Sequence, residues 1–198
     1  MREAMKAVVR GIAVFFVLPL LLIWWIEAHL LGRDRALEYA TEALALLPGL
    51  TGRYLRRAFL SCVLKKCHPT SEIGFGAIFS KADAIIDENV YVGPRCQIGL
   101  VHLERDVLLA AGVHVTSGAQ THGTADPTRP MREQEGVRAL VRIGAGAWVG
   151  SAAVVMADVG AGTVVGAGAV VTKALPGHVV AAGVPARVLH SRKSPASD

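Results

Sequence analysis

Aromatic residues and cysteines are scarce in this sequence. Phe, Trp and Tyr make up 6% of the 198 residues, which argues against an aromatic core, whereas 21 glycines favour a fold built on small, repeated turns. Cys62, Cys67 and Cys96 form an odd number without CxxC spacing. They fit neither a disulfide nor a zinc framework and are expected to be free thiols in a reducing compartment.

The chain also lacks the interleaved aromatic and basic residues that bind nucleic acid, so no nucleic-acid partner is expected. Its formal net charge is +5, and much of the surplus lies in residues 1–66. Basic residues beside apolar helices favour anionic membrane lipid as the partner. The basic positions here include Arg2, Lys6, Arg10, Arg33, Arg35, Arg53, Arg56, Arg57, Lys65 and Lys66.

Residues 11–26 are uncharged and almost wholly apolar. A secretory signal peptide is disfavoured, because no small-residue cleavage site follows the run. A buried core helix is an alternative, although this helix would be apolar all round. A membrane helix is the leading interpretation, since the run extends through residues 28–31 toward the roughly 20 residues that a span needs. Pro19 removes one backbone donor in mid-run, which predicts a kink.

Residues 36–67 are expected to form an amphipathic helical linker with a break at Pro48-Gly49. Apolar residues recur at steps of three and four on both sides of the break, as on one face of a helix. Basic residues accompany the second set, so this part either lies on a membrane surface or packs on its own domain. The apolar positions are Leu37, Ala40, Leu44 and Leu47, then Leu55, Phe59, Leu60 and Val63.

From Ile73 onward, an apolar residue recurs every six residues and is often followed by Gly. This step is typical of hexapeptide repeats that coil into a parallel β-helix. Each six supplies a short strand and a turn, three make one triangular coil, and one inward residue per six fills the axis. The repeating positions are Ile73, Phe79, Ile85, Ile86, Val92, Ile98, Leu103, Leu109 and Val115, and after a gap Ile143, Val149, Val155, Val159, Val165 and Val171.

Two irregularities interrupt the repeat. Residues 118–140 are polar and contain Pro127 and Pro130, so they are expected to form a loop ejected from the coil. Loops of this length are usually functional or disordered. A step of four from Val155 to Val159 deletes two residues from a coil, which is expected to tilt the groove beside it.

We therefore predict an all-β fold, a single-stranded parallel β-helix preceded by N-terminal membrane-associated α-helices. The expected organisation begins with a membrane-inserted or re-entrant helix over residues 1–35 and the linker over residues 36–67. The β-helix domain with its ejected loop follows over residues 68–190. Residues 191–198 are expected to be a flexible tail.

Three blocks of sequence stand out: Thr121-His122, residues 143–151 (IGAGAWVGS) and residues 165–188 (VGAGAVVTKALPGHVVAAGVPARV). With the repeats, they resemble the left-handed β-helix acyltransferases of the hexapeptide-repeat superfamily, in particular sugar O-acetyltransferases related to galactoside and maltose acetyltransferases. The resemblance covers about residues 73–190. It implies a left-handed coil and a homotrimer that binds acetyl-CoA, the acyl donor, between neighbouring subunits, with no metal.

The resemblance also makes His122 the general base. An imidazole has a pKa near working pH and can take a proton from an acceptor hydroxyl as it attacks the thioester. On its own, His122 would be interpreted as a solvated loop histidine. The oxyanion is expected to be stabilised by a backbone amide or by the side chain of Ser117 or Gln120.

Six further positions match family residues that contact acetyl-CoA. One is a tryptophan near the active site, for which capping of the coil is the alternative, and two meet pantetheine through backbone amides. The last three lie at the nucleotide end and the adenosine phosphates, where basic groups suit phosphate oxygens; for the two basic ones, solvated charge is the alternative. In chain order the six are Trp148, Ser151, Ala167, Thr172, Lys173 and Arg187.

Because the acyl donor acetyl-CoA is cytoplasmic, it limits how the membrane helix can be oriented. A simple span with a basic N-terminal side would place the rest of the chain outside the cytoplasm. We therefore favour a re-entrant or interface-lying helix bent at Pro19, on the inner (cytoplasmic) membrane, with the catalytic domain facing the cytoplasm.

The sequence thus predicts an acetyl-CoA-dependent O-acetyltransferase acting on a membrane-associated or polysaccharide-precursor sugar, a glycan or lipid-linked acceptor. The alternatives are an N-acyltransferase on a nucleotide-linked amino sugar and a non-catalytic membrane-recruited scaffold. A zinc enzyme of the carbonic-anhydrase type would need three converging histidines, such as His102, His114 and His122. The first two are two sixes apart and are expected to face different sides of the coil.

Overall fold

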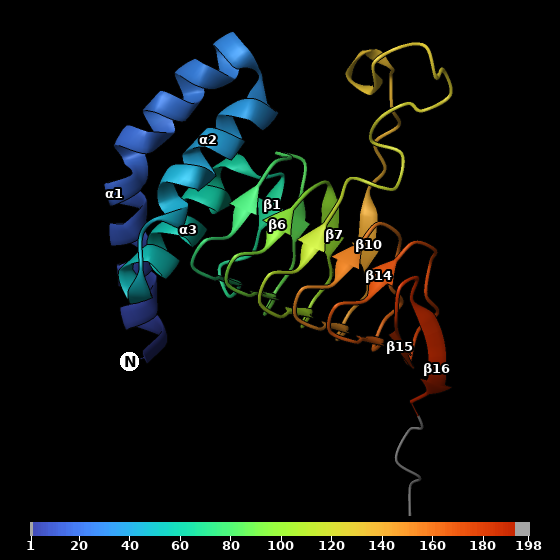
Figure 1. The fold of residues 1–198 in the computed structure, drawn as a ribbon. Helices are drawn as coiled ribbons and strands as arrows, with labels where there is room; N and C mark the ends of the chain where they lie inside the picture. The colour runs from blue at the N-terminus through green and yellow to red at the C-terminus, as the bar shows by residue number, and fades with distance from the viewer. Residues whose placement is uncertain (1, 193–198) are drawn as a thin grey trace, which may run out of the picture.

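A coil of short strands dominates the computed structural model, which describes residues 2–192 (Figure 1). Three helices precede it: α1 (Arg2–Leu31), α2 (Arg33–Ala45) and α3 (Gly49–Val63). Helices α2 and α3 lie against the first coil, and α1 lies outside them. The predicted class, a left-handed parallel β-helix after N-terminal helices, is confirmed.

Three sheets form the sides of the coil. Sheet A contains β1 (Lys66–Cys67), β4 (Ile85–Ile86), β7 (Val101–Leu103) and β10 (Val141–Ile143). Sheet B contains β2 (Glu72–Ile73), β5 (Tyr91–Val92), β8 (Leu108–Leu109), β11 (Trp148–Val149), β13 (Val164–Val165), β15 (Val179–Ala182) and β16 (Arg187–Ser191). Sheet C contains β3 (Ile78–Phe79), β6 (Gln97–Ile98), β9 (His114–Val115), β12 (Val154–Val155) and β14 (Val170–Val171). In sheet B only β16 runs antiparallel, which leaves six parallel strands and a coil of about six turns.

The inward residues of the repeat fill the axis of the coil. All the predicted positions are at most 2% exposed except Ile85, which is half-buried beside Ile86. A second residue, two positions earlier, is also buried in most repeats, because side chains two apart in an extended chain point the same way. Each six therefore buries two side chains, and not the single one predicted. The second set contains Ala77, Ala84, Val90, Cys96, Val101, Val107, Val113, Val141, Ala147, Ala153, Thr163 and Ala169.

The six-residue repeat begins one unit earlier than the sequence indicated. Strand β1 pairs Cys67 with Ile86, and Cys67 lies six residues before Ile73. A free cysteine behaves as a small hydrophobic residue, so Cys67 takes the place of an aliphatic one. Burial raises the pKa of the Cys67 thiol and raises that of Cys96 to about 11. All three cysteines are free, and only Cys62 is exposed.

Arg56 of α3 joins the helices to the first coil. It is 3% exposed and donates hydrogen bonds to the carbonyl oxygens of Leu44 (3.2 Å), Leu47 (2.7 Å) and Ile73 (3.2 Å). Leu44 and Leu47 lie at and just beyond the C-terminal end of α2, where carbonyl groups need donors from outside the helix. The Leu44 carbonyl also accepts the Leu47 N–H at 3.2 Å. Burial, and then the charge of Arg53, lowers the pKa of Arg56. Helix α3 therefore packs on its own domain, one of the two alternatives for the basic part of residues 36–67.

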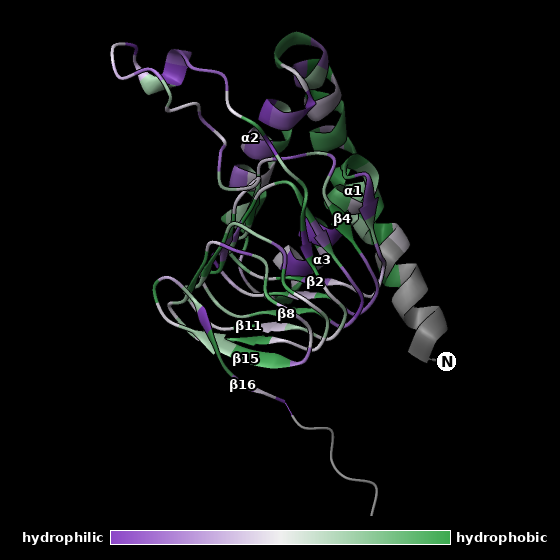
Figure 2. Cartoon of the chain, turned by 90° about the vertical axis from the view of Figure 1, so that its right-hand side faces the viewer, coloured by the Kyte–Doolittle hydropathy of each residue, from purple (hydrophilic) through white to green (hydrophobic). Residues whose placement is uncertain are grey.

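Helix α1 packs side-on against α2 and α3 along one face. Its opposite face is apolar and exposed, with Phe15 and Phe16 at 69% and 67%. Much of α1 has the green colour of apolar residues in Figure 2. The stretch Gly11–Leu31 is long and apolar enough to cross a membrane, and only 11% of its most apolar 18 residues are buried. The helix continues through Pro19. The packed face contains Ala13, Val14, Val17, Leu20, Leu21 and Trp24, at helical spacing.

The C-terminal coils are shorter than the others. The step of four from Val155 to Val159 recurs from Val171 to Leu175, and on sheet A these coils pair only through single bridges. Strand β16 closes this end, and the Arg192 N–H donates to the His178 carbonyl at 2.7 Å. Residues 191 and 192 of the expected tail therefore belong to the fold. Met1 and residues 193–198 lie outside the described residues.

Candidate active site

His122 lies on the ejected loop, which leaves the coil after β9 and returns at β10 (Figure 1). The two limbs of the loop are held together by backbone hydrogen bonds from Val137 N–H to the Gln120 carbonyl (2.7 Å) and from Ala139 N–H to the Ser117 carbonyl (2.9 Å). A 3₁₀ turn, η1 (Met131–Glu133), lies near the tip. The loop is therefore a folded structure that holds His122 away from the coil.

Two glycines let the limbs approach each other at His122. A Cβ atom at Gly136 would lie 2.3 Å from the carbonyl of Thr121 and 2.5 Å from the His122 nitrogen. A Cβ atom at Gly123 would lie 2.5 Å from the Glu135 carbonyl oxygen. The His122 side chain is exposed and has no hydrogen-bond partner among residues 2–192. It lines a shallow polar pocket with Thr121, Gln134 and Arg138, so its ring is free to meet a ligand.

The corners that follow sheet C form one edge of the coil, here called the C–A edge. At successive corners the first residue after the strand donates its N–H to the carbonyl of the last strand residue in the next coil, as Ser80 does to Ile98 and Thr116 to Val155. The corner residues therefore stack in register, in the order Ser80, Gly99, Thr116, Met156 and Thr172. The ejected loop leaves this edge just after Thr116. Thr172 and Lys173 are exposed on the same edge two coils further on. Since neighbouring strands lie about 4.8 Å apart, the loop base and Thr172 are about 10 Å apart.

The other predicted contacts gather on the next edge, which follows sheet B. Ser151 and Ala167 are stacked there, and the Gly168 N–H donates to the Ser151 carbonyl at 2.8 Å. Trp148 stands on sheet B in the same coil and is 51% exposed. Arg187 is exposed on β16 opposite Ala182, at the end of this edge. One chain therefore presents two sets of predicted residues, on edges separated by sheet C.

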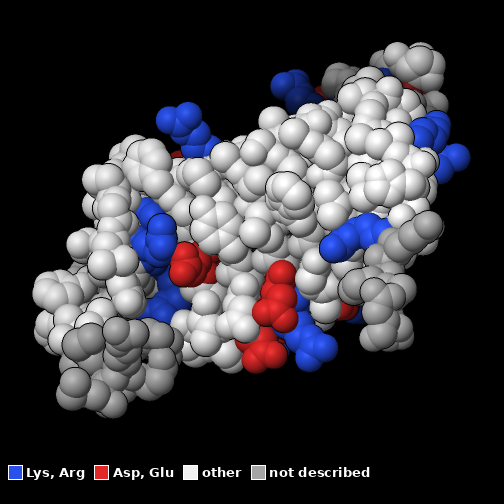
Figure 3. All heavy atoms as spheres, turned by 90° about the horizontal axis from the view of Figure 1, so that it is seen from below, with Lys and Arg blue, Asp and Glu red and all other residues white. Residues whose placement is uncertain are grey.

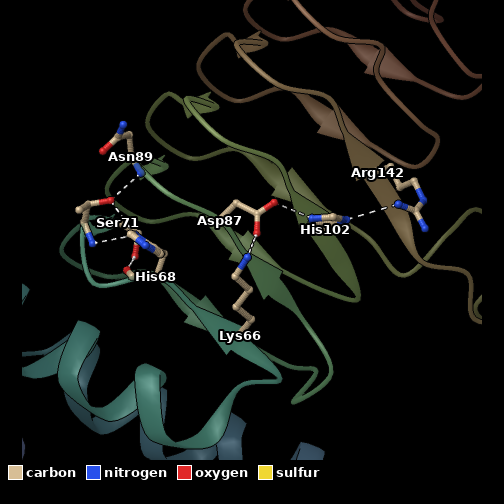
Figure 4. Close-up of polar contacts among 8 residues, drawn as sticks. Lys66, His68, Ser71, Asp87, Asn89, His102 and Arg142 are labelled. Carbon is tan, nitrogen blue, oxygen red and sulfur yellow. Dashed lines mark hydrogen bonds and ion pairs between the residues drawn. The ribbon is translucent and has the colours of Figure 1, made fainter.

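A polar network on the outer surface of sheet A was not anticipated from the sequence (Figure 4). His102 Nε2 lies 2.9 Å from an Asp87 carboxylate oxygen, and the Lys66 ammonium donates to the other oxygen at 2.5 Å. His102 Nδ1 lies 3.4 Å from the Arg142 guanidinium. These side chains are separated by 15 to 40 positions in the chain, and only the coil's register brings them together.

Both ring nitrogens of His102 are occupied in this network. Arg142 is a donor only, so Nδ1 accepts and Nε2 carries the proton toward Asp87. Burial raises the pKa of Asp87, but the hydrogen bonds from Lys66 and His102 and the charge of Lys66 outweigh it and hold that pKa below its usual value. Although a His–Asp pair resembles a base with its orienting group, His102 has no nitrogen left for an acceptor hydroxyl. We interpret the network as structural.

The histidines proposed for zinc do not converge. His102 lies on β7 of sheet A, whereas His114 lies on β9 of sheet C, as the spacing predicted. Among residues 2–192, no group of three His, Cys, Asp or Glu side chains is arranged to hold a metal ion.

The two side chains proposed for the oxyanion differ in access. Ser117 is 6% exposed, and its hydroxyl accepts the Leu100 N–H at 2.9 Å, which turns it into the coil. Gln120 is exposed on the loop two residues before His122. Of the two, Gln120 is the one within reach of a ligand at the loop.

The fold defines the chain as a parallel β-helix of six-residue repeats. It is similar to a maltose O-acetyltransferase from Clostridium difficile 630, with a TM-score of 0.67 and 18% identity over 81% of this chain and 89% of that one. It is also similar to a galactoside acetyltransferase in complex with coenzyme A, with a TM-score of 0.51 and 20% identity over 81% and 80%.

A mutant of AntD, an N-acyltransferase from Bacillus cereus in complex with dTDP and coenzyme A, has a TM-score of 0.52 and 17% identity over 63% of this chain and 74% of that one. No sequence-family model and no curated protein sequence matches the chain. At identities of 20% or lower, the likeness shows the shared fold.

Proposed function

We propose that the protein is an acetyl-CoA-dependent O-acetyltransferase that acts on a sugar hydroxyl at a membrane surface. The observation that carries the proposal is the position of His122. Its imidazole is exposed, has no hydrogen-bond partner among residues 2–192, and stands on a folded loop that leaves the same edge as Thr172 and Lys173. The coenzyme A in the similar galactoside acetyltransferase and AntD structures supports the donor.

The chemistry needs one base and no metal. His122 takes the proton from the acceptor hydroxyl, whose oxygen attacks the thioester carbonyl carbon. As the tetrahedral intermediate collapses, the C–S bond breaks, and the departing sulfur takes the proton back from the imidazolium. The products are the acetyl ester and coenzyme A. We propose that the Gln120 amide donates a hydrogen bond to the oxyanion.

A trimer explains why the predicted cofactor residues lie on two edges. Acetyl-CoA between two copies meets Ser151, Ala167 and Arg187 on one edge of one copy. It meets Thr172 and Lys173 on the C–A edge of the next. Leu108 and Trp148, 41% and 51% exposed on sheet B, offer apolar surface for contact between copies. Charged side chains are also sparse on the side away from the ejected loop (Figure 3).

The acceptor is proposed from α1. A helix that spanned the bilayer would carry α2 into it, and α2 exposes Glu38 and Glu42. An interface-lying α1 keeps those carboxylates in water while lipid covers Phe15 and Phe16. We therefore propose an enzyme bound to the cytoplasmic face of the inner membrane that acts on a membrane-associated or polysaccharide-precursor sugar.

The similarity to AntD favours a second candidate, an N-acyltransferase on a nucleotide-linked amino sugar. Purified protein with labelled acetyl-CoA and two acceptor panels, lipid-linked sugars and nucleotide-linked amino sugars, separates the two. An alkali-labile ester on the first panel supports the proposal, whereas an alkali-stable amide on the second supports the alternative. Failure to bind acetyl-CoA in calorimetry would leave the non-catalytic scaffold.

A further inference from the structure

A polar pocket opens where α1 ends and α2 begins. Leu31, the last residue of α1, lines it together with four basic side chains from three separate segments. Arg33 and Arg35 come from the first turn of α2, and Lys81 comes from the corner after β3. Arg138 reaches in from the returning limb of the ejected loop.

Four cations and three carboxylates line this pocket, which gives the lining a net charge of +1. Lys81 pairs with Asp34 at 3.1 Å, and Arg33 lies 3.5 Å from Asp83. Glu38 is the third carboxylate in the lining. Arg35 and Arg138 have no ion-pair partner among the described residues, and both are exposed. Two free guanidinium groups that converge on one pocket suit the oxygens of a phosphate, which Arg binds in a bidentate manner.

Arg138 connects this pocket to His122. The same side chain lines the pocket at the α1–α2 junction and the pocket that His122 lines. The α1–α2 junction and the ejected loop also project from the same side of the coil in two views at right angles (Figures 1 and 2). The two pockets are therefore neighbours that share Arg138.

Lys81, the base of the ejected loop and Thr172 follow one another along the C–A edge. Lys81 follows Ser80 at the corner beside α2, and the ejected loop leaves the same edge two coils later. At about 4.8 Å per coil, the two points are about 10 Å apart. Thr172 follows after two more coils. Acceptor and acetyl-CoA thus approach His122 from opposite ends of one edge.

The pocket also lies at the end of the apolar helix. The stretch suited to a membrane ends at Leu31, and Arg33 follows two residues later. If α1 lies in the interface, as proposed above, basic side chains beside its end lie at the level of the lipid phosphates. A phosphate carried on a lipid anchor therefore reaches this pocket without leaving the membrane surface.

We infer that this pocket binds the phosphate or diphosphate that links an acceptor sugar to its lipid anchor, so that the sugar lies at His122. The inference rests on the proposed function for its acceptor and names that acceptor's class, a lipid-linked phosphosugar. Arg35 and Arg138 bind the phosphate. Arg138 also lines the pocket of His122, so it fixes how far the phosphate lies from the loop.

The test is a binding measurement without acetyl-CoA, so its outcome is separate from that of the transferase assay. Full-length protein in detergent is dialysed to equilibrium against geranylgeranyl diphosphate, geranylgeraniol or inorganic pyrophosphate. Arg35→Ala and Arg138→Ala are compared with the wild type. Arg105→Ala, an exposed arginine beside a different polar pocket on sheet A, is the matched control.

The wild type is expected to bind the lipid diphosphate more tightly than the alcohol or free pyrophosphate. Each pocket variant is expected to weaken that binding roughly tenfold, since a charge-assisted hydrogen bond is lost, while the control leaves it unchanged. Equal binding by the pocket variants, or no preference over the alcohol, would overturn the phosphate site. Equal affinity for inorganic pyrophosphate would overturn the lipid-linked source.

Discussion

A Cβ atom at Gly136 would lie 2.5 Å from the backbone nitrogen of His122. The two limbs of the ejected loop thus meet where the proposed base is attached, with no room for a side chain between them. The position of His122 depends on a residue 14 positions further along the chain.

Gly136→Ala is expected to displace His122 and to lower kcat by roughly 10- to 100-fold, because an error of about 1 Å in a catalytic group has that effect. Thr124→Ala, an exposed change on the same loop, is the control and is expected to keep kcat. Calorimetry should show unchanged acetyl-CoA affinity for both. A normal kcat for Gly136→Ala would mean that the loop geometry does not set the base.

Arg56 is expected to be the residue on which attachment of the helical cap depends most. Arg56→Ala removes the donor of three hydrogen bonds to backbone carbonyl groups and should destabilise the protein by roughly 2–4 kcal/mol in chemical unfolding. Arg53→Ala on the same helix removes an exposed pair with Glu72 (2.7 Å) and should cost at most about 1 kcal/mol. Equal losses for the two variants would contradict the role given to Arg56.

The network on sheet A predicts an acid-sensitive contribution to stability. The pKa of Asp87 is lower in the folded protein than in the unfolded chain, so its stabilisation is fully present above the unfolded value, about 4, and is lost as the pH falls through the folded one. The difference in Tm between the wild type and Asp87→Asn should therefore be largest near pH 6 and shrink below about pH 4. A difference that stays constant with pH would exclude this linkage.

The exposed face of α1 predicts membrane binding that does not depend on the catalytic domain. Phe15→Glu and Phe16→Glu place charges on side chains that are 69% and 67% exposed, so folding should be retained. Both variants should lose binding to anionic vesicles in a flotation assay, whereas Val137→Glu, 66% exposed on the loop, should not. If all three float like the wild type, α1 does not make the contact with lipid.

The sequence predicted the regular parts of this molecule well, because a strict six-residue step has one structural solution. Its failures are local. Cys67 was missed because its side chain is not aliphatic, although it occupies the first rung. The basic helix left a membrane surface and packing on the domain both open, because charge pattern alone does not reveal that Arg56 is buried against backbone carbonyls.

The site was less predictable than the fold. The loop's length and polarity indicated ejection, but its closure at Gly136 depends on contacts between two limbs. The network of Asp87 and His102 arises from register between coils, which no local motif encodes. Arg138 lines both pockets, and this too depends on where α1 and α2 lie against the coil.

The most direct test of the central claim is the kcat of His122→Ala in an assay that follows release of the coenzyme A thiol with a lipid-linked sugar acceptor. We predict a fall of roughly 10²- to 10⁴-fold, the contribution expected of a general base, with acetyl-CoA affinity retained in calorimetry. Thiol release at the wild-type rate would contradict the account and remove His122 from the mechanism.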